Sequence, residues 1–289
     1  MARWALWTFL CSFAGTLAGG CGYVRSVAIR DLMAEVAQTT LRHDDVDLVM
    51  EALPTYLLLM DNLIEADPGN AELLRAAAEG YFSYAILVET ANPSRAAVLY
   101  LRAKGYGTAA LIARRPAVAD LLVGPFPQFE NIAQHLHGSD VPFVFWAAST
   151  WGAWIAAHPD SMGALADLPR VMVLMEWVLD RDESFRHGSA HVFLGVYHAA
   201  LPPILGGDPR RAQAHFEAAL AMTDGQDLMV YVQMARFYAR QIFDRDLYVS
   251  LLERVLASPV ATTLADLTLQ NAAAQRLARI MLADVDVYF

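Results

Sequence analysis

The residues of this sequence whose types and spacing best fit a chemical site are Glu183, His187 and His191. They follow one another at intervals of four, so a continuous α-helix would align one carboxylate and two imidazoles. Such ligands suit a divalent metal, and the function they indicate is a metal-dependent enzyme. However, Gly188 weakens a helix at this point, and a buried histidine can instead bond to a backbone carbonyl. We therefore expect no metal, no cofactor and no enzymatic activity, and we keep the metal-dependent enzyme as an alternative.

Aromatic residues form a second group of candidates, because they could line a ligand cleft. Trp151 and Trp154 lie three residues apart and Trp146 lies five before Trp151, so their indoles could approach one another on a helix. Indole rings offer broad apolar contact and one hydrogen-bond donor each. The expected lining of the cleft is Tyr81, Tyr100, Arg102, Tyr106, Trp146, Trp151, Trp154 and His191. Burial in the hydrophobic core is the alternative for the aromatic members.

Arginines are the candidate partners for an anionic ligand. Arg102 lies between Tyr100 and Tyr106 and could make a bidentate contact with a carboxylate. We expect the neighbouring arginines at positions 95, 114 and 115 to form ordinary ion pairs on helix surfaces.

The motifs GxSxG, HExxH, the P-loop and GxGxxG do not occur with the strands that those sites require. The acidic turn at 180–183 lacks the glycine and the closing glutamate of a calcium loop.

The elements that would position these residues are helices arranged in antiparallel hairpins. The clearest hairpin covers residues 168–201, where two stretches with apolar residues at helical spacing flank the charged turn. A single hairpin cannot bury both of its faces, so it requires stacked neighbours. We therefore predict an all-α protein of stacked antiparallel helical hairpins, either a tetratricopeptide-like (TPR-like) α-solenoid or a compact helical bundle.

Two places carry the TPR pattern, in which small residues let two helices approach and an aromatic ring fills the groove beside them. The first comprises Leu74, Ala77, Ala78 and Tyr81 on one helix and Ala96, Tyr100 and Ala103 on its partner. The second comprises Leu194 and Gly195 with Ala212, Phe216 and Ala219. We also expect Pro54 to kink or divide the helix predicted over residues 46–66, with Asp44 or Asp45 as its N-cap.

The N-terminus has the pattern of a secretory signal that ends in a lipidated cysteine. Arg3 supplies positive charge, residues 4–17 are apolar, and Leu17-Ala18-Gly19-Gly20-Cys21 resembles a bacterial lipobox. An ordinary secretory signal or an uncleaved anchor helix are the alternatives. The expected organisation is a signal peptide at 1–20, a tether at 21–28, and one TPR-like helical domain at 29–289 with an irregular insertion at about 114–141.

Composition narrows the class of protein. The chain has 289 residues, of which 56% are hydrophobic, which is enough for a large core, but charged residues interrupt nearly every candidate membrane span after the N-terminus. Cys11 lies within the signal and Cys21 would carry lipid, so the processed chain offers no thiol for catalysis or disulfides. Loss of Arg3 with the signal takes the net charge from −10 to −11. With Lys104 as its single lysine, the protein is a poor candidate for binding nucleic acid.

From Asp45 to the C-terminus the chain carries a series of motifs: Ala52-Leu53-Pro54 with the apolar run to Ile64, Asp67-Pro68 with residues 73–84, Tyr100 to Gly107, Trp146 to Trp154, Ala166 to Arg170, Asp182 to Phe185 with His187, Gly188 and His191, and His215-Phe216-Glu217 with Ala219. In order and spacing, these motifs resemble the T-component family of tripartite ATP-independent periplasmic (TRAP) transporters. Gly105 stands where the resemblance leads us to expect an acidic residue before Tyr106, which weakens any role assigned to the Arg102 segment.

The resemblance implies a non-enzymatic, all-helical lipoprotein of the periplasm that acts as a binding or scaffold component. Its implied partners are the TRAP periplasmic substrate-binding protein and, through lipid on Cys21, a bacterial membrane, the outer one rather than the inner. It also implies self-association, with a trimer as the candidate state, and a hydrophobic or carboxylate ligand. The alternative is a helical assembly factor unrelated to transport, whose repeats grip a segment of another protein.

Overall fold

The computed structural model describes Met33 and residues 35–289, and within this part all regular elements are helices. In chain order they are α2 (Val46–Ala66), α3 (Ala71–Glu89), α4 (Pro93–Arg114), η1 (Pro116–Val118), α5 (Ala119–Val123), α6 (Phe126–Phe129), η2 (Glu130–His135), η3 (Gly138–Asp140), α7 (Val141–Ala156), α8 (Met162–Leu165), α9 (Leu168–Arg181), α10 (Phe185–Ala200), η4 (Pro203–Leu205), α11 (Pro209–Met222), α12 (Leu228–Gln233), the π-helix η5 (Met234–Ala239), α13 (Arg245–Ala257), η6 (Ala265–Leu267), α14 (Thr268–Ala283) and α15 (Val285–Tyr288). The predicted all-α fold is confirmed.

Polar side chains at turns determine where the first helices begin. The side chains of Asp45, Asn70 and Asn92 accept hydrogen bonds from backbone N–H groups in the first turns of α2, α3 and α4. Helix α2 continues through Pro54 as one element, so the proline does not divide it. Packing of α2 against α3 along its length supports both halves.

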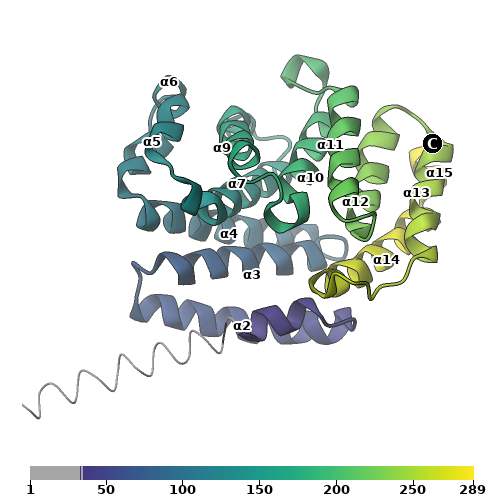
Figure 1. Ribbon diagram of the computed structural model, residues 1–289, viewed down its shortest axis with the longest axis horizontal. Helices are drawn as coiled ribbons and strands as arrows, with labels where there is room; N and C mark the ends of the chain where they lie inside the picture. Colours follow the sequence, from purple (N-terminus) through teal and green to yellow (C-terminus); the bar gives the residue numbers. More distant parts are fainter. Residues whose placement is uncertain (1–32, 34) are drawn as a thin grey trace, which may run out of the picture.

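The helices stack as antiparallel neighbours, and the stack curls back on itself (Figure 1). Helix α3 packs against α4, α4 against α7, α7 against α9, and α10 against α11. At the end of the chain α14 returns to α2, where Arg276 pairs with Asp47. Two further ion pairs connect the second half of the chain to α3. Arg186 of α10 lies 3.0 Å from Glu79, and Arg236 of η5 lies 3.2 Å from Glu89.

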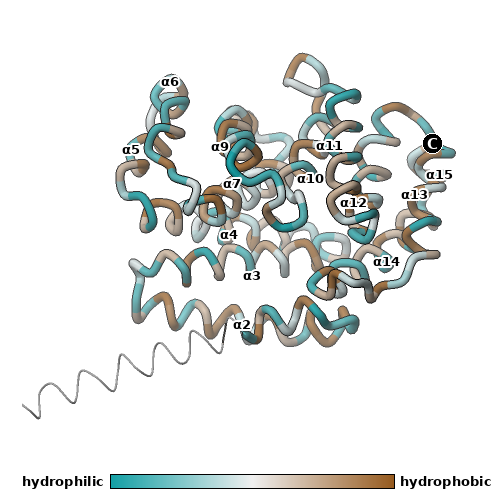
Figure 2. The backbone as a smooth tube through the Cα atoms, viewed as in Figure 1, coloured by the Kyte–Doolittle hydropathy of each residue, from teal (hydrophilic) through white to brown (hydrophobic). Residues whose placement is uncertain are grey.

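The residues of the TPR pattern lie at buried contacts between helices. Ala77, Ala78 and Ala103 are fully buried, and Tyr81 and Tyr100 are nearly so. Gly195 on α10 faces the ring of Phe216 on α11, and a Cβ atom added to this glycine would lie 3.0 Å from that ring. Figure 2 shows hydrophobic and hydrophilic residues alternating around the helices, as partly buried helices require. None of the described helices is long and apolar enough to cross a membrane.

The segment between α4 and α7 consists of short helical turns held by a buried carboxylate. Asp140 is completely buried and accepts hydrogen bonds from Arg114 at 2.9 Å, Arg115 at 2.5 Å and the backbone N–H of His137 at 2.9 Å. Burial opposes ionisation, but these three donors outweigh it and lower the pKa of Asp140. The sequence predicted only surface ion pairs for the two arginines, whereas they anchor this segment to the stack.

Candidate functional site

Helices α2, α3 and α4 bring three polar side chains together around Asp61. The carboxylate of Asp61 accepts hydrogen bonds from the hydroxyl groups of Tyr81 and Tyr106, both at 2.7 Å. The Arg102 guanidinium lies 3.3 Å from the same carboxylate and donates to the Tyr81 hydroxyl at 3.0 Å. Three of the predicted cleft residues therefore meet, but they meet around an acid that the sequence did not single out. In the sequence, Asp61 was marked only as a charged residue within the apolar stretch 57–64.

The charge of Asp61 and the burial of the rings make the two phenols poor acids. Burial and then the hydrogen bond to Asp61 raise the pKa of Tyr81 to about 12. The same causes raise the pKa of Tyr106. Both hydroxyl groups thus remain protonated donors, and Arg102 balances the charge of Asp61. The Asp61 cluster (Asp61, Tyr81, Arg102 and Tyr106) is a closed polar network rather than a proton-transfer site.

Tyr100 lies apart from the Asp61 cluster. Its hydroxyl group donates to Glu89 at 3.1 Å, and Glu89 in turn pairs with Arg236 of η5. Burial and the charge of Glu89 raise the pKa of Tyr100. Its ring packs against Phe82, with 6.0 Å between ring centroids. Tyr100 therefore joins α4 to the second half of the stack and does not line a cleft with Tyr81.

The three tryptophans of α7 do not form one cluster. Trp146 contacts Phe82 and Phe145, with ring centroids 5.6 and 5.2 Å away. Residues five apart on a helix point in different directions, and Trp151 accordingly faces another side of α7. The sequence predicted that the three tryptophans line one cleft, whereas the structure places Trp146 apart from Trp151 and Trp154.

Trp151 and Trp154 enclose the single lysine of the chain. The Lys104 ammonium lies 3.6 Å from the ring centroid of Trp154 and 4.8 Å from that of Trp151. Asp167 completes the arrangement, because it lies 3.8 Å from Lys104 and accepts a hydrogen bond from the Trp151 indole at 3.0 Å. Burial lowers the pKa of Lys104, although the charge of Asp167 opposes this effect. Both indoles therefore pack around Lys104.

Glu183, His187 and His191 do not share one helix face, because the start of α10 is not a regular helix. Arg186, His187 and Gly188 have φ angles of 47°, 58° and 80°, which is a left-handed turn. The turn sends His187 to Asp266, at 2.7 Å, while His191 bonds to Glu183 at 2.9 Å. Among the residues that the structure describes, no three acidic, histidine or cysteine side chains form a metal site.

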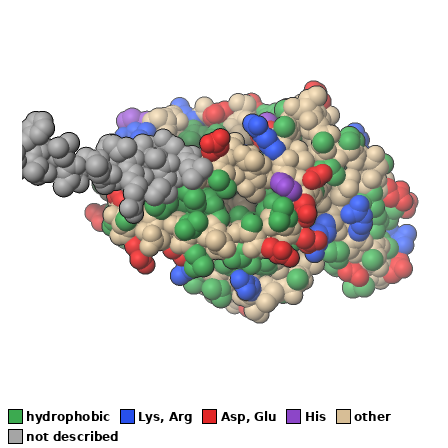
Figure 3. Space-filling view, turned by 90° about the horizontal axis from the view of Figure 1, so that it is seen from below, with side chains coloured by type: hydrophobic (Ala, Val, Ile, Leu, Met, Phe, Trp, Pro, Cys, Tyr) green, Lys and Arg blue, Asp and Glu red, His purple; other side chains and the backbone are tan. Residues whose placement is uncertain are grey.

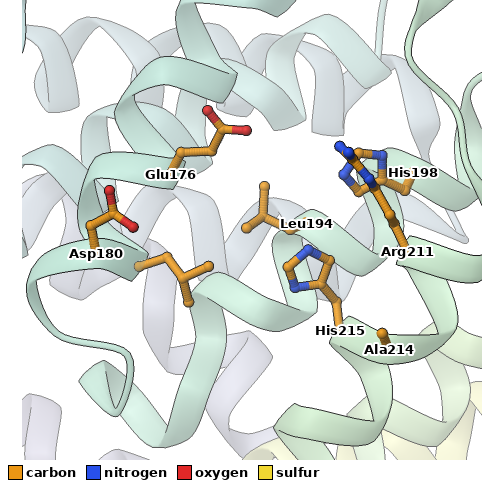
Figure 4. Close-up of a pocket in the computed structure, with 8 residues that line it drawn as sticks. Glu176, Asp180, Leu194, His198, Arg211, Ala214 and His215 are labelled. Atoms are coloured by element: carbon orange, nitrogen blue, oxygen red, sulfur yellow. The ribbon is translucent and has the colours of Figure 1, made fainter.

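His191 belongs instead to a histidine cluster that borders a pocket. Its Nδ1 lies 2.8 Å from Nδ1 of His215, and the ring of His215 stacks on that of His198, 5.8 Å away and at an angle of 6°. The pocket has a volume of about 460 Å³ (Figure 4). Its lining is Glu176, Leu179, Asp180, Leu194, His198, Arg211, Ala214 and His215. None of these was predicted as a site residue, because α9, α10 and α11 combine only in the folded chain.

The sequence as a whole identifies the family. The family model for the TRAP transporter T-component matches residues 42–289, which is nearly the whole described chain. The chain belongs to the TRAP transporter T-component family. The resemblance predicted from the ordered motifs is confirmed. No curated protein matches the sequence.

As a T-component, the chain is a component associated with a TRAP transporter. The matched residues include the Asp61 cluster, the enclosed Lys104 and the histidine cluster. Cys21, the signal at 1–20 and the tether at 21–28 lie outside both the matched and the described residues. The division into signal, tether and one domain therefore stays a prediction.

Acidification is expected to destabilise this T-component through His215. Burial first, and then the charges of His191, His198 and Arg211, lower the pKa of His215 to about 4, whereas an unfolded chain gives histidine a pKa of about 6.5. The unfolded state binds the proton first, so the contribution of neutral His215 is complete above about pH 6.5 and is lost progressively toward about pH 4. Because the ring borders an open pocket, solvent screens these charges, and the expected loss in the free energy of unfolding is about 1–2 kcal/mol.

Urea unfolding of the native chain and of His215→Gln at about pH 7.5, 5.5 and 4 would measure this loss. The difference between the two profiles isolates His215 from the carboxylates, which titrate in both proteins. Parallel profiles between pH 7.5 and 4 would contradict the expectation.

Proposed function

We propose that this T-component is a lipid-anchored scaffold that binds the periplasmic substrate-binding protein of its TRAP system through the outer face of α2 and α4. The observation that carries the proposal is an exposed apolar surface around the Asp61 cluster. Leu58 on α2 is 67% exposed, and Val98 and Leu101 on α4 are 67% and 54% exposed. Figure 3, which views the molecule from the α2 side, shows hydrophobic side chains over the middle of the face, with charged ones among and around them.

Two properties of this surface suit a protein partner. Arg102 is 57% exposed, yet its guanidinium is held by Asp61 and Tyr81, so little side-chain freedom is lost when a partner covers it. Arginine beside exposed apolar side chains is typical of interface centres. Membership of the TRAP transporter T-component family supports a protein of that transport system as the partner.

Lipid on Cys21 would hold the scaffold at a bacterial membrane, with the outer membrane as the proposed location. The support is the lipobox-like sequence that ends at Cys21 and the periplasmic transport system with which the family is associated. A single acyl chain binds membranes only marginally, so stable anchoring requires the multiple acylation of a bacterial lipoprotein. The apolar surface could also serve self-association, for which a trimer is the candidate state.

The test is capture of TRAP components by the membrane-bound protein. Replacing both Leu58 and Leu101 by aspartate is expected to weaken binding of the substrate-binding protein by about 10- to 100-fold, because each change places a charge in the apolar centre. The matched control is Ile204→Asp, since Ile204 is 90% exposed but lies on η4. Cys21→Ala should move the protein from the membrane fraction to the soluble fraction.

Light scattering of each variant separates the two uses of this surface. A change of mass without loss of capture would assign the surface to self-association and contradict the docking proposal. Capture of no TRAP component by the native protein would contradict the proposed function itself and favour an assembly factor.

A further inference from the structure

We infer that the pocket between α9, α10 and α11 binds a small zwitterion, with Glu176 and Asp180 facing its ammonium group and Arg211 its carboxylate. This goes beyond the proposed docking function, because it assigns a small-molecule site on a surface made by other helices. Figure 4 shows the two acids on one side of the pocket, Arg211 and His198 on the other, and Leu194 between them.

The charged side chains of the pocket are available to a ligand. Within the described part of the chain, neither Glu176 nor Asp180 forms a side-chain hydrogen bond or ion pair. Arg211 has one long ion pair, 3.8 Å from its Nε to Asp208, and its side chain is 69% exposed. Asp208 is already engaged as the N-cap of α11, where it accepts from the backbone N–H groups of Arg210 and Arg211. The guanidinium therefore has donors to offer a carboxylate.

The tautomers of His198 and His215, which line the pocket, leave their Nε2 atoms as hydrogen-bond acceptors. Nδ1 of His198 lies 2.9 Å from the carbonyl oxygen of Gly206, which can only accept, so Nδ1 carries the proton. The neutral ring then presents Nε2 as an acceptor. By the same reasoning, His191 donates from Nε2 to Glu183, and in the neutral pair its Nδ1 accepts from Nδ1 of His215. Nε2 of His215 is consequently an acceptor as well.

Two carboxylates facing one guanidinium define the class of ligand. The carboxylates of Glu176 and Asp180 favour an ammonium group, which brings only donors. A purely anionic ligand would meet two carboxylates, and a purely apolar one would desolvate these charges without pairing them. The volume of about 460 Å³ and the apolar floor of Leu179 and Leu194 suit a small molecule with a short hydrocarbon between its two charges.

Calorimetric titration of the full chain near pH 7.5 tests the assignment with two zwitterions, L-leucine and 5-aminovalerate, and two singly charged analogues, valerate and pentylamine. At least one zwitterion is expected to bind with a Kd below about 10 mM. Both analogues should bind at least about tenfold more weakly, because each leaves one side of the pocket unpaired.

Substitutions assign the two ends of the ligand. Arg211→Gln and the double change Glu176→Gln with Asp180→Asn should each weaken zwitterion binding by about tenfold or more, whereas the control Arg210→Gln on the same helix should not. Binding of neither zwitterion, equal binding of valerate, or binding unaffected by these substitutions would overturn the inference. These residues lie away from Leu58 and Leu101, so partner capture by the same variants reports on the docking proposal separately.

Discussion

Replacing Asp140 by alanine is expected to destabilise the folded chain by about 2–4 kcal/mol. The carboxylate is fully buried and is shared by Arg114, Arg115 and the N–H of His137, so its removal leaves three donors without a common acceptor. The arginines are 38% and 28% exposed and can recover part of their hydration, which keeps the loss below that of a fully buried pair. Urea unfolding measures it, and Asp120→Ala in the same segment is the control, because that side chain is exposed.

The Asp140 variant also tests whether the segment between α4 and α7 is fixed to the stack. Limited proteolysis should cleave Asp140→Ala first between residues 115 and 140, whereas the native chain resists there. An unchanged unfolding midpoint would show that the apolar anchors of this segment, such as Phe129, hold it alone.

The acid sensitivity of Asp140 differs from that of His215. The pKa of Asp140 is lowered by folding, so its contribution is present above the unfolded value of about 3.9 and is lost only as the pH falls below it. A loss of stability between pH 6.5 and 4 that the His215→Gln variant does not share therefore reports on His215, whereas the contribution of Asp140 is lost at lower pH. The Asp140→Ala variant should lose stability less steeply than the native chain below pH 4.

The sequence predicted the helices well because local signals mark them. Helix α2 begins after Asp45 and ends before the turn at Asp67 because a side-chain cap and a proline-containing turn act within a few residues. The small and aromatic residues of the TPR pattern lie in the core for the same reason, since helical spacing fixes which face they share.

The arrangement of the polar sites could not be predicted, although several of their residues were, because it depends on contacts between residues far apart in the sequence. Asp61 meets Tyr81 and Tyr106 across 20 and 45 residues of chain. The left-handed turn at Arg186 and His187 places two non-glycine residues in an uncommon conformation, and it separates His187 from His191. The spacing of apolar residues along a helix predicts neither the contacts of Asp61 nor the left-handed turn. The pocket is equally a product of packing, because α9 supplies its acids and α11 its arginine.

Replacing Gly195 by valine is expected to destabilise the chain by about 2–3 kcal/mol, because Gly195 on α10 packs directly against α11. A Cβ atom at this position would lie 3.0 Å from the ring of Phe216, which is completely buried and cannot turn away without a cavity. Gly105→Val is the matched control, since no heavy atom outside its own helix lies within 4 Å of an added Cβ there. Urea unfolding of both variants measures the difference.

A double change distinguishes steric crowding from a general effect of valine in a helix. Phe216→Ala alone should cost about 3–5 kcal/mol, but the space it opens should accept the valine, so Gly195→Val with Phe216→Ala should cost less than the sum of the two single changes. Simple additivity would contradict close packing at this crossing. Because α11 also supplies Arg211 and His215 to the pocket, the single Gly195→Val variant should bind zwitterions more weakly, whereas Gly105→Val should bind them as the native chain does.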